Sequence, residues 1–248
     1  MQTFSLEGKT VLVTGASSGI GRATAIQCAA AGARCILAAR NADRLAETLA
    51  SCGGAPHTVE QIDLADDAAL ASFIDRLPSL DGLVHCAGIG DNQKPLKFLS
   101  PQFVDLILSI NLRAPILLLS CLAKQKKLNA SASIVMISSI ASFHPAPAHS
   151  IYAAAKGGLS AFVKGAAQDL APRKIRVNSI APGMVETPLI DFSALTREQR
   201  LADELRYPLK RYGQPSDIAP LAVYLLSDAS SWMTGSQIVI DGGLTIGS

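Results

Sequence analysis

Short apolar runs alternate along the chain with longer stretches in which apolar side chains recur at helical spacing. The short runs predict strands at Lys9–Thr14, Arg34–Ala39, Thr58–Ile62, Asp81–Cys86, Ile134–Ile137, Ile175–Ile180 and Gln237–Ile240. The stretches between them predict helices, several of which end at Gly or Pro. Strands that alternate with helices of about 10 to 15 residues are typical of βαβ units. We therefore predict an α/β fold built on a parallel sheet with right-handed crossovers.

The stretch from Leu189 to about Tyr212 departs from this alternation, because polar and apolar residues are mixed in it. A long segment that leaves a sheet edge is a candidate lid over a binding site. The 248 residues contain no repeat, no low-complexity tract and no interdomain linker, so we expect one domain spanning residues 1–248.

A glycine-rich turn joins the first predicted strand to an alanine-rich helix. Gly15 allows the tight turn, while Gly19 and Gly21 let the backbone approach a phosphate and let the helix pack against the strand. The helix N-terminus offers unpaired N–H groups and the positive end of its dipole to a pyrophosphate. This context favours dinucleotide binding over the alternative, an ordinary turn between a strand and a helix.

The end of the second predicted strand bears on which dinucleotide binds. Ala39 provides no carboxylate for a ribose 2′-hydroxyl, and Arg40 follows it directly. Because a guanidinium fits a phosphate in bidentate fashion, we predict NADP(H) rather than NAD(H). The alternative is that Arg40 caps the strand or pairs with Asp43 or Asp63.

Candidate chemistry lies between Ser139 and Lys156. Tyr152 and Lys156 are four residues apart, so on a helix their side chains share one face. Ser139 follows a buried strand and can hydrogen-bond a carbonyl oxygen, to which Tyr152 can pass a proton. Because a nearby ammonium favours the phenolate, we expect Lys156 to lower the pKa of Tyr152 towards neutrality. The alternative is that Tyr152 packs at a helix boundary and Lys156 is solvated.

Composition and charge narrow the classes of function. The chain is 49% hydrophobic and 17% charged, which is enough apolar content to fill a core. A net charge of +2 and 5% aromatic residues give no reason to expect a nucleic acid or membrane partner, and the apolar run Ala114–Ala123 is too short to span a bilayer. The five cysteines lack metal-ligand spacing, so we predict no metal and reduced thiols in a cytoplasmic setting. The N-terminus does not have the pattern of a signal peptide.

Taken together, these motifs resemble the short-chain dehydrogenase/reductase family over nearly the whole chain. The residues that carry the resemblance are Thr14–Gly21, Asp63, Leu64, Ala87, Gly88, Asn111, Ser139, Tyr152, Lys156, Pro182, Gly183, Thr187 and Asp241–Gly243. The resemblance implies one Rossmann-like, doubly wound domain with a seven-stranded parallel sheet flanked by helices. It also implies a homo-oligomer, commonly a tetramer.

The resemblance assigns roles to these residues. Tyr152 would be the proton donor, Ser139 would position the carbonyl, and Lys156 would hold the nicotinamide ribose. Asn111 would hold a water molecule in a proton relay; otherwise its amide is a satisfied core group or marks a bend at Pro115. Asp63 and Leu64 would lie at adenine, and Val185 and Thr187 at the carboxamide. The full set of implied cofactor contacts is Gly15, Ser17, Ser18, Gly19, Ile20, Gly21, Arg40, Asp63, Leu64, Ala87, Gly88, Tyr152, Lys156, Pro182, Gly183, Val185 and Thr187.

The sequence indicates the type of reaction more closely than it indicates the substrate. The chain is similar to 3-oxoacyl-(acyl carrier protein) reductases, which would make acyl carrier protein a partner through basic residues near the entrance. Arg173 falls at one such position, whereas the other falls near Ala130, which is not basic, although Lys126 and Lys127 are close. The bulky segment Phe143–Pro147 is expected to line the cleft and favours a compact ketone or alcohol, such as a sugar, a steroid or a small alcohol. Within it, His144 either touches substrate or packs as an ordinary surface histidine.

Two further points stay open in the sequence. Cys86 stands where the family usually has Asn, and we expect local repacking there rather than lost activity. A non-catalytic dinucleotide sensor or scaffold on the same fold is the alternative from another class of function. The intact set of Asn111, Ser139, Tyr152 and Lys156 argues against it.

Overall fold

The computed structural model describes residues 4–54, 56–190 and 196–246. Seven strands form one parallel sheet in the order β3-β2-β1-β4-β5-β6-β7, which confirms the predicted doubly wound α/β fold. The strands are β1 (Thr10–Thr14), β2 (Arg34–Ala39), β3 (Thr58–Gln61), β4 (Leu80–His85), β5 (Leu128–Ile137), β6 (Arg176–Pro182) and β7 (Gln237–Ile240). Each of them overlaps a predicted strand, and β5 begins six residues earlier than its apolar run because Leu128 pairs with Leu80.

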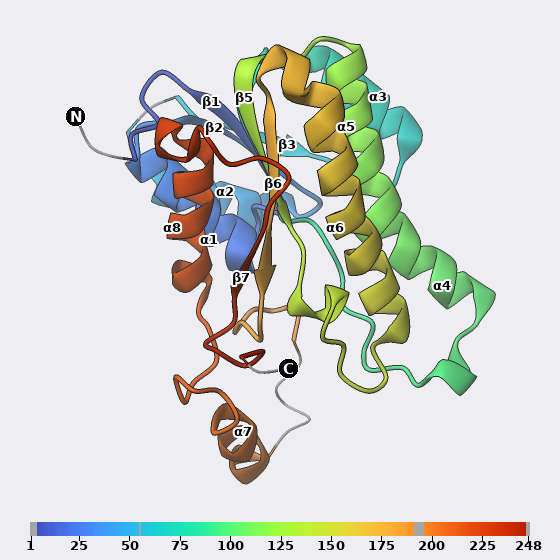
Figure 1. Ribbon diagram of the computed structural model, residues 1–248. Helices are drawn as coiled ribbons and strands as arrows, with labels where there is room; N and C mark the ends of the chain where they lie inside the picture. The colour runs from blue at the N-terminus through green and yellow to red at the C-terminus, as the bar shows by residue number, and fades with distance from the viewer. Residues whose placement is uncertain (1–3, 55, 191–195, 247–248) are drawn as a thin grey trace.

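Helices cover both faces of the sheet (Figure 1). One face carries α1 (Gly19–Ala30), α2 (Ala42–Cys52) and α8 (Pro215–Leu226); the other carries α3 (Asp67–Arg76), α4 (Pro101–Leu108), α5 (Ala114–Lys124) and α6 (Ser150–Leu170). Each layer buries its own apolar cluster against the sheet. Burying one large aliphatic or aromatic side chain stabilises a fold by about 1.5–3 kcal/mol, so these two clusters hold the strand ends in fixed positions.

Capping residues begin the helices where the sequence predicts. The side chain of Asn41 accepts a hydrogen bond from Arg44 N (2.8 Å) at the start of α2, and Ser100 accepts one from Phe103 N (3.3 Å) at the start of α4. Pro101 occupies the first turn of α4, where its missing N–H costs nothing.

The helix that follows Ser100 is longer and less regular than its pattern suggests. Between α4 and α5, residues Ser109–Arg113 form a π-helical turn. Within the described part of the chain, Pro101–Lys124 is the helical stretch that is long and apolar enough to cross a membrane, and 39% of its most apolar window is buried in the fold. The run Ala114–Ala123 is therefore only part of a longer apolar helix.

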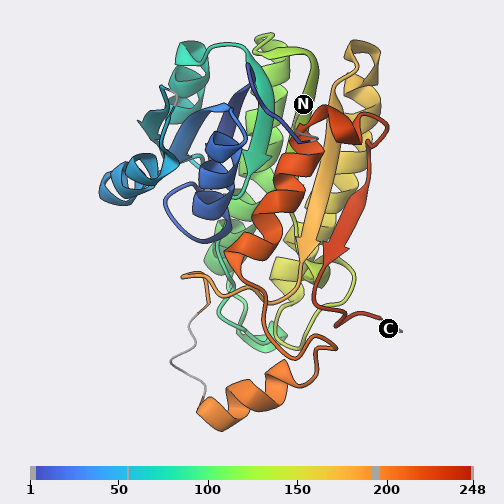
Figure 2. The same cartoon turned by 90° about the vertical axis from the view of Figure 1, so that its left-hand side faces the viewer.

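The predicted lid segment contains a short helix, α7 (Arg197–Glu204), which lies beyond the carboxyl end of the sheet (Figure 2). Thr196 and Gln199 form a capping box at its start. Arg200 pairs with Glu186 and with Glu204, so α7 is tied to the loop that follows β6. Residues 191–195, near the start of the lid, lie outside the described residues, and closure over a site stays a prediction.

Candidate active site

The carboxyl ends of parallel strands meet at one edge of the sheet, and the predicted cofactor residues lie there. Gly15 follows β1, Arg40 follows β2, Ala87 and Gly88 follow β4, and Gly183 follows β6. The structure therefore brings together residues that are far apart in the chain, at the edge where ligands bind in open α/β sheets.

The glycine turn forms a close backbone cradle that has no room for side chains. Gly15 has a φ of +65°, and a Cβ on it would lie 2.8 Å from Ala87 N; a Cβ on Gly21 would lie 2.2 Å from Gly15 O. Gly19 has a φ of +53°, and its Cβ would lie 3.1 Å from Thr187 Cγ2. Two expected cofactor segments, the glycine turn and the loop after β6, thus face each other across Gly19.

The N-terminus of α1 is open towards this cradle. Ser18 precedes the helix with extended backbone angles, and its side chain makes no capping hydrogen bond. Backbone N–H groups at such an end, with the helix dipole behind them, favour an anionic group. The residues present therefore fit a dinucleotide phosphate.

No described residue pairs with the side chain of Arg40 in a way that would prevent a phosphate contact. Arg40 is exposed at the end of β2, and its carbonyl oxygen accepts a hydrogen bond from Gln61 Nε2 (3.0 Å). Among the described residues it forms no ion pair, so the alternative pairing with Asp43 or Asp63 is wrong. Asp63 instead accepts a hydrogen bond from Ala65 N (3.0 Å).

The three candidate catalytic side chains converge beside the cradle. Tyr152 and Lys156 lie one turn apart on α6, and Ser139, which follows β5, is near enough to Tyr152 to lower the pKa of its phenol. The ammonium of Lys156 donates to Ile137 O (2.9 Å) and lies 5.7 Å from the centroid of the Tyr152 ring. A Cβ on Gly88 would lie 3.7 Å from Lys156 Nζ, which places the loop after β4 against the same group.

The electrostatics of this site correct one expectation. Burial raises the pKa of Tyr152 to about 12, and the hydrogen bond from Ser139 offsets only part of that rise. Lys156 does not lower the pKa of Tyr152 as predicted, because its ammonium is directed to the Ile137 carbonyl and burial lowers its own pKa to about 8. Tyr152 is therefore a protonated phenol at neutral pH, which is the form that can donate a proton.

Asn111 is buried in the π-helical turn and hydrogen-bonds the loop after β4. Its Nδ2 donates to Ile89 O (3.0 Å) and Ile107 O (3.2 Å), and its Oδ1 accepts from Ile89 N (3.1 Å). A Cβ on Gly88 would lie only 2.8 Å from Asn111 Oδ1. These contacts favour the satisfied core amide that we considered as an alternative, and the water relay through Asn111 stays a prediction.

Two of the implied cofactor contacts have side chains that belong to the core. Leu64 is 8% exposed and Val185 is 5% exposed, so each can offer a cofactor only a small contact surface. At Cys86, Thr14 Oγ1 accepts hydrogen bonds from Cys86 N (3.2 Å) and Ala87 N (3.3 Å). These two hydrogen bonds fix the turn after β4 without a side-chain amide at position 86. This is consistent with the expected local repacking around Cys86.

Two polar residues near Tyr152 were not singled out by the sequence reasoning. Asp91 Oδ1 lies 2.6 Å from His149 Nδ1, and the centroid of the His149 ring lies 6.4 Å from that of Tyr152. The only sequence signal is position: Asp91 comes three residues after Gly88, and His149 comes three residues before Tyr152.

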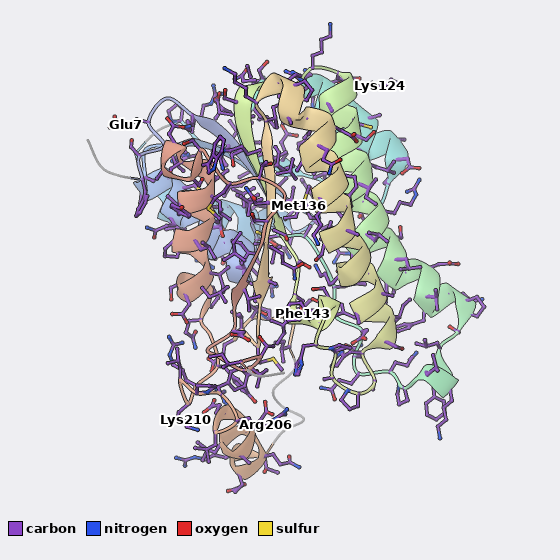
Figure 3. The ribbon with its side chains drawn as sticks, viewed as in Figure 1. Glu7, Lys124, Met136, Phe143, Arg206 and Lys210 are labelled. Carbon is purple, nitrogen blue, oxygen red and sulfur yellow. The ribbon has the colours of Figure 1, made fainter. Side chains whose placement is uncertain are left out.

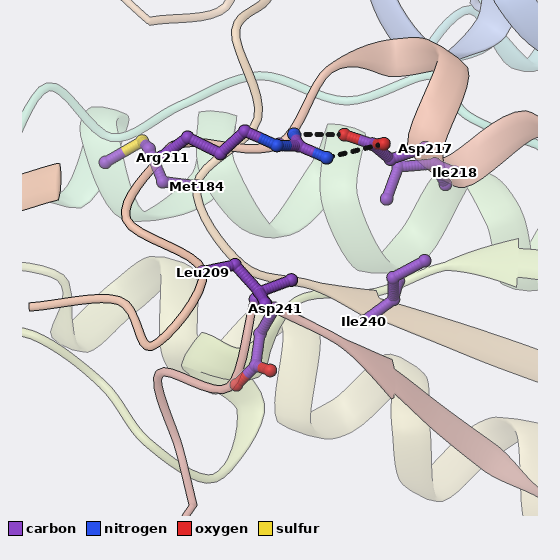
Figure 4. Close-up of a pocket in the computed structure, with 9 residues that line it drawn as sticks. Met184, Leu209, Arg211, Asp217, Ile218, Ile240 and Asp241 are labelled. Atoms are coloured by element: carbon purple, nitrogen blue, oxygen red, sulfur yellow. Dashed lines mark hydrogen bonds and ion pairs between the residues drawn. The ribbon is translucent and has the colours of Figure 1, made fainter.

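Phe143 and a separate cavity flank this end of the sheet. Phe143 is 51% exposed where the chain runs from β5 towards α6, and its place in a substrate cleft stays a prediction (Figure 3). The cavity, of about 200 Å³, is lined by Met184, Leu209, Arg211, Gly213, Asp217, Ile218, Ile240, Asp241 and Gly242. Arg211 and Asp217 form a bidentate ion pair in it, with distances of 2.6 and 3.0 Å (Figure 4). No candidate catalytic residue lines this cavity, so it is not the catalytic cleft.

Known proteins resemble this chain in sequence and in structure. Residues 15–245 match the family described as Enoyl-(Acyl carrier protein) reductase. The chain is 36% identical to the uncharacterized oxidoreductase YxbG of Bacillus subtilis, over 96% of this chain and 92% of that protein. It is 33% identical to the 3-oxoacyl-(acyl-carrier-protein) reductase FabG of Thermotoga maritima, over 97% and 99%. A solved structure from Agrobacterium tumefaciens with bound NADP is 34% identical and superposes with a TM-score of 0.87 over 98% of this chain and 99% of that one.

The glycine cradle, the Ser139–Tyr152–Lys156 site and these matches agree across nearly the whole chain. The chain therefore belongs to the short-chain dehydrogenase/reductase family and is a nicotinamide-dependent oxidoreductase.

Proposed function

We propose that this enzyme uses NADP(H) to interconvert a ketone and a secondary alcohol. The observation that carries the proposal is the convergence of Ser139, Tyr152 and Lys156 beside the glycine cradle. A bound nicotinamide supplies or accepts the hydride, and the chain supplies position, a proton and electrostatic stabilisation.

Each of the three side chains has a distinct task at the carbonyl oxygen. Tyr152, kept protonated by burial, donates the proton as negative charge develops on that oxygen. The hydroxyl of Ser139 holds the same oxygen and the phenol in register through hydrogen bonds. Lys156, 5% exposed, contributes a nearby positive charge in a site where little water screens it.

Two observations support NADP(H) over NAD(H). Ala39 at the end of β2 has no carboxylate for a ribose hydroxyl, and the guanidinium of Arg40 next to it is exposed and makes no ion pair among the described residues. The Agrobacterium tumefaciens structure, 34% identical, holds NADP.

The substrate is proposed at the level of a ketone, with two candidate classes. A 3-oxoacyl thioester is the substrate that the name of the Thermotoga maritima relative indicates. Docking of an acyl carrier protein would rely on Arg173, whose guanidinium here donates to the carbonyl oxygen of Leu128, and Ala130 adds no charge. The exposed ring of Phe143 fits the other class, a compact ketone.

The experiment is to follow the oxidation of NADPH, with NADH in parallel, against a 3-oxoacyl thioester and a panel of small, sugar and steroid ketones. We expect turnover on at least one ketone and a higher kcat/KM for NADPH than for NADH. Tight binding of NADPH without turnover on any carbonyl or alcohol would overturn the proposal in favour of a dinucleotide sensor.

We also propose that the protein is a homo-oligomer, as a tetramer is common in the family. The helical stretch Pro101–Lys124 is apolar but only 39% of its apolar window is buried, and Leu106 on α4 is 47% exposed. An apolar helix face of this kind is a suitable surface for a second copy. Light scattering coupled to size exclusion measures the mass directly, and a monomer at micromolar concentration would contradict the proposal.

A further inference from the structure

A carboxylate and an imidazole meet beside Tyr152, and the proposed chemistry uses neither of them. Asp91 lies in the loop after β4, and His149 directly precedes the first turn of α6. Asp91 Oδ1 lies 2.6 Å from His149 Nδ1 and also accepts a weaker hydrogen bond from Gln93 N (3.3 Å).

The second oxygen of this carboxylate, Oδ2, is buried and unpaired among the described residues. Asp91 is 1% exposed, and its Oδ2 has no hydrogen-bond partner among the described residues. Leaving a buried carboxylate oxygen unpaired is costly, so protein interiors rarely do it without a functional reason. The site therefore requires a hydrogen-bond donor that the described part of the chain does not provide.

The imidazole provides a second polar atom. Wherever the carboxylate of Asp91 accepts in the contact with His149, the shared proton lies on Nδ1. A ring with that single proton has its lone pair on Nε2, and the described residues provide no partner for this atom. The side chain of His149 is 27% exposed, so a ligand can reach it.

The pair lies next to one of the reacting groups, Tyr152. The His149 and Tyr152 rings meet edge-on, with centroids 6.4 Å apart. A Cβ on Gly90, next to Asp91 in the chain, would lie 3.6 Å from Leu189 O, where the predicted lid begins. Asp91 and His149 thus lie near both the proton donor and the start of the predicted lid.

We propose that Asp91 and His149 form a subsite that accepts hydrogen bonds from a hydroxyl group next to the substrate carbonyl, so that the substrate is a hydroxy ketone and the product a vicinal diol. This inference rests on the proposed function and names the class of its substrate. A site built to pair with a substrate hydroxyl discriminates against an analogue without one, because its buried acceptors stay unpaired when that analogue binds. A substrate with a plain acyl chain would leave Asp91 Oδ2 without a hydrogen-bond partner.

The test compares 1-hydroxy-2-butanone with 3-pentanone, in which a methyl group replaces the hydroxyl. We expect wild-type kcat/KM to favour the hydroxy ketone by about tenfold to a hundredfold, the scale of a hydrogen bond to a charged group. In Asp91→Asn and His149→Phe this ratio falls towards one, mainly through KM for the hydroxy ketone, and activity on 3-pentanone stays within about threefold. Asp105→Asn, the same change at an exposed carboxylate on α4, keeps the wild-type ratio.

Several outcomes would overturn the inference. A wild-type ratio near one would do so, as would an unchanged ratio in both variants, or a stronger preference for 1-amino-2-butanone, which would mean a cationic ligand. Binding of NADPH reports whether each variant is folded. If one of the two variants does not fold, the ratio measured with the other variant decides the test.

A separate readout distinguishes failure of this inference from failure of the reductase proposal. The affinities of the complex with NADP⁺ for butane-1,2-diol and pentan-3-ol are measured by ligand-observed NMR. If no ketone is reduced, the reductase proposal fails, and the ratio of these two affinities still decides whether the Asp91–His149 subsite recognises a hydroxyl. Equal affinities would overturn the subsite.

Discussion

The substitution Gly19→Ala separates the cost of backbone strain from the loss of cofactor binding. Gly19 has a φ of +53°, where an L-residue costs about 1–2 kcal/mol. Its new methyl group would lie 3.1 Å from Thr187 Cβ and Cγ2, closer than the usual carbon–carbon contact of about 3.5–4.0 Å, so the loop after β6 must shift by a few tenths of an ångström. We expect the free energy of unfolding to fall by about 1–2 kcal/mol and the affinity for NADPH to fall at least about tenfold.

Gly8→Ala is the matched control. Gly8 also has a positive φ, +75°, but a Cβ there would meet nothing within 4 Å. This variant should lose a similar amount of stability and bind NADPH as the wild type does. Urea unfolding gives the stability and fluorescence titration gives the affinity. If Gly19→Ala bound NADPH as tightly as Gly8→Ala, the glycine turn would not be the phosphate cradle.

Three further predictions follow from the same geometry. Tyr152→Phe removes the proton donor, so turnover should fall by about 100-fold or more while NADPH still binds; near wild-type turnover would refute the role. Arg40→Asp places a carboxylate at the end of β2, so the Kd for NADPH should rise much more than that for NADH, and equal changes would show that Arg40 does not meet the 2′-phosphate. Burial lowers the pKa of Lys156 from 10.5 to about 8, so between these pH values the unfolded chain binds more protons than the folded one. The free energy of unfolding of the wild type, measured in urea against Lys156→Met, should therefore rise by up to about 3 kcal/mol from pH 8 to 10.5, and a flat difference would show that this ammonium is not desolvated.

Most of the fold follows from local patterns in the chain. The central strands β1 and β2 were predictable because parallel strands covered on both faces are mostly buried and rich in apolar residues. Turn residues such as Gly32 and Pro78 separate strands from helices. The irregular helix was harder to predict, since the π-helical turn at Ser109–Arg113 has no signal in propensity. Within this turn, Asn111 hydrogen-bonds Ile89 of another loop, a contact between segments that are distant in the sequence.

The amino-acid sequence by itself determined the parts of the site that depend on spacing within one segment. The glycine turn between β1 and α1 and the placement of Tyr152 and Lys156 on one helix face are of this kind, because secondary-structure geometry alone relates residues a few positions apart. Only the tertiary structure decided the direction of the Tyr152 pKa and the meeting of Asp91 with His149. Both depend on how deeply groups are buried and on which distant segments pack together, and 58 residues of chain separate Asp91 from His149.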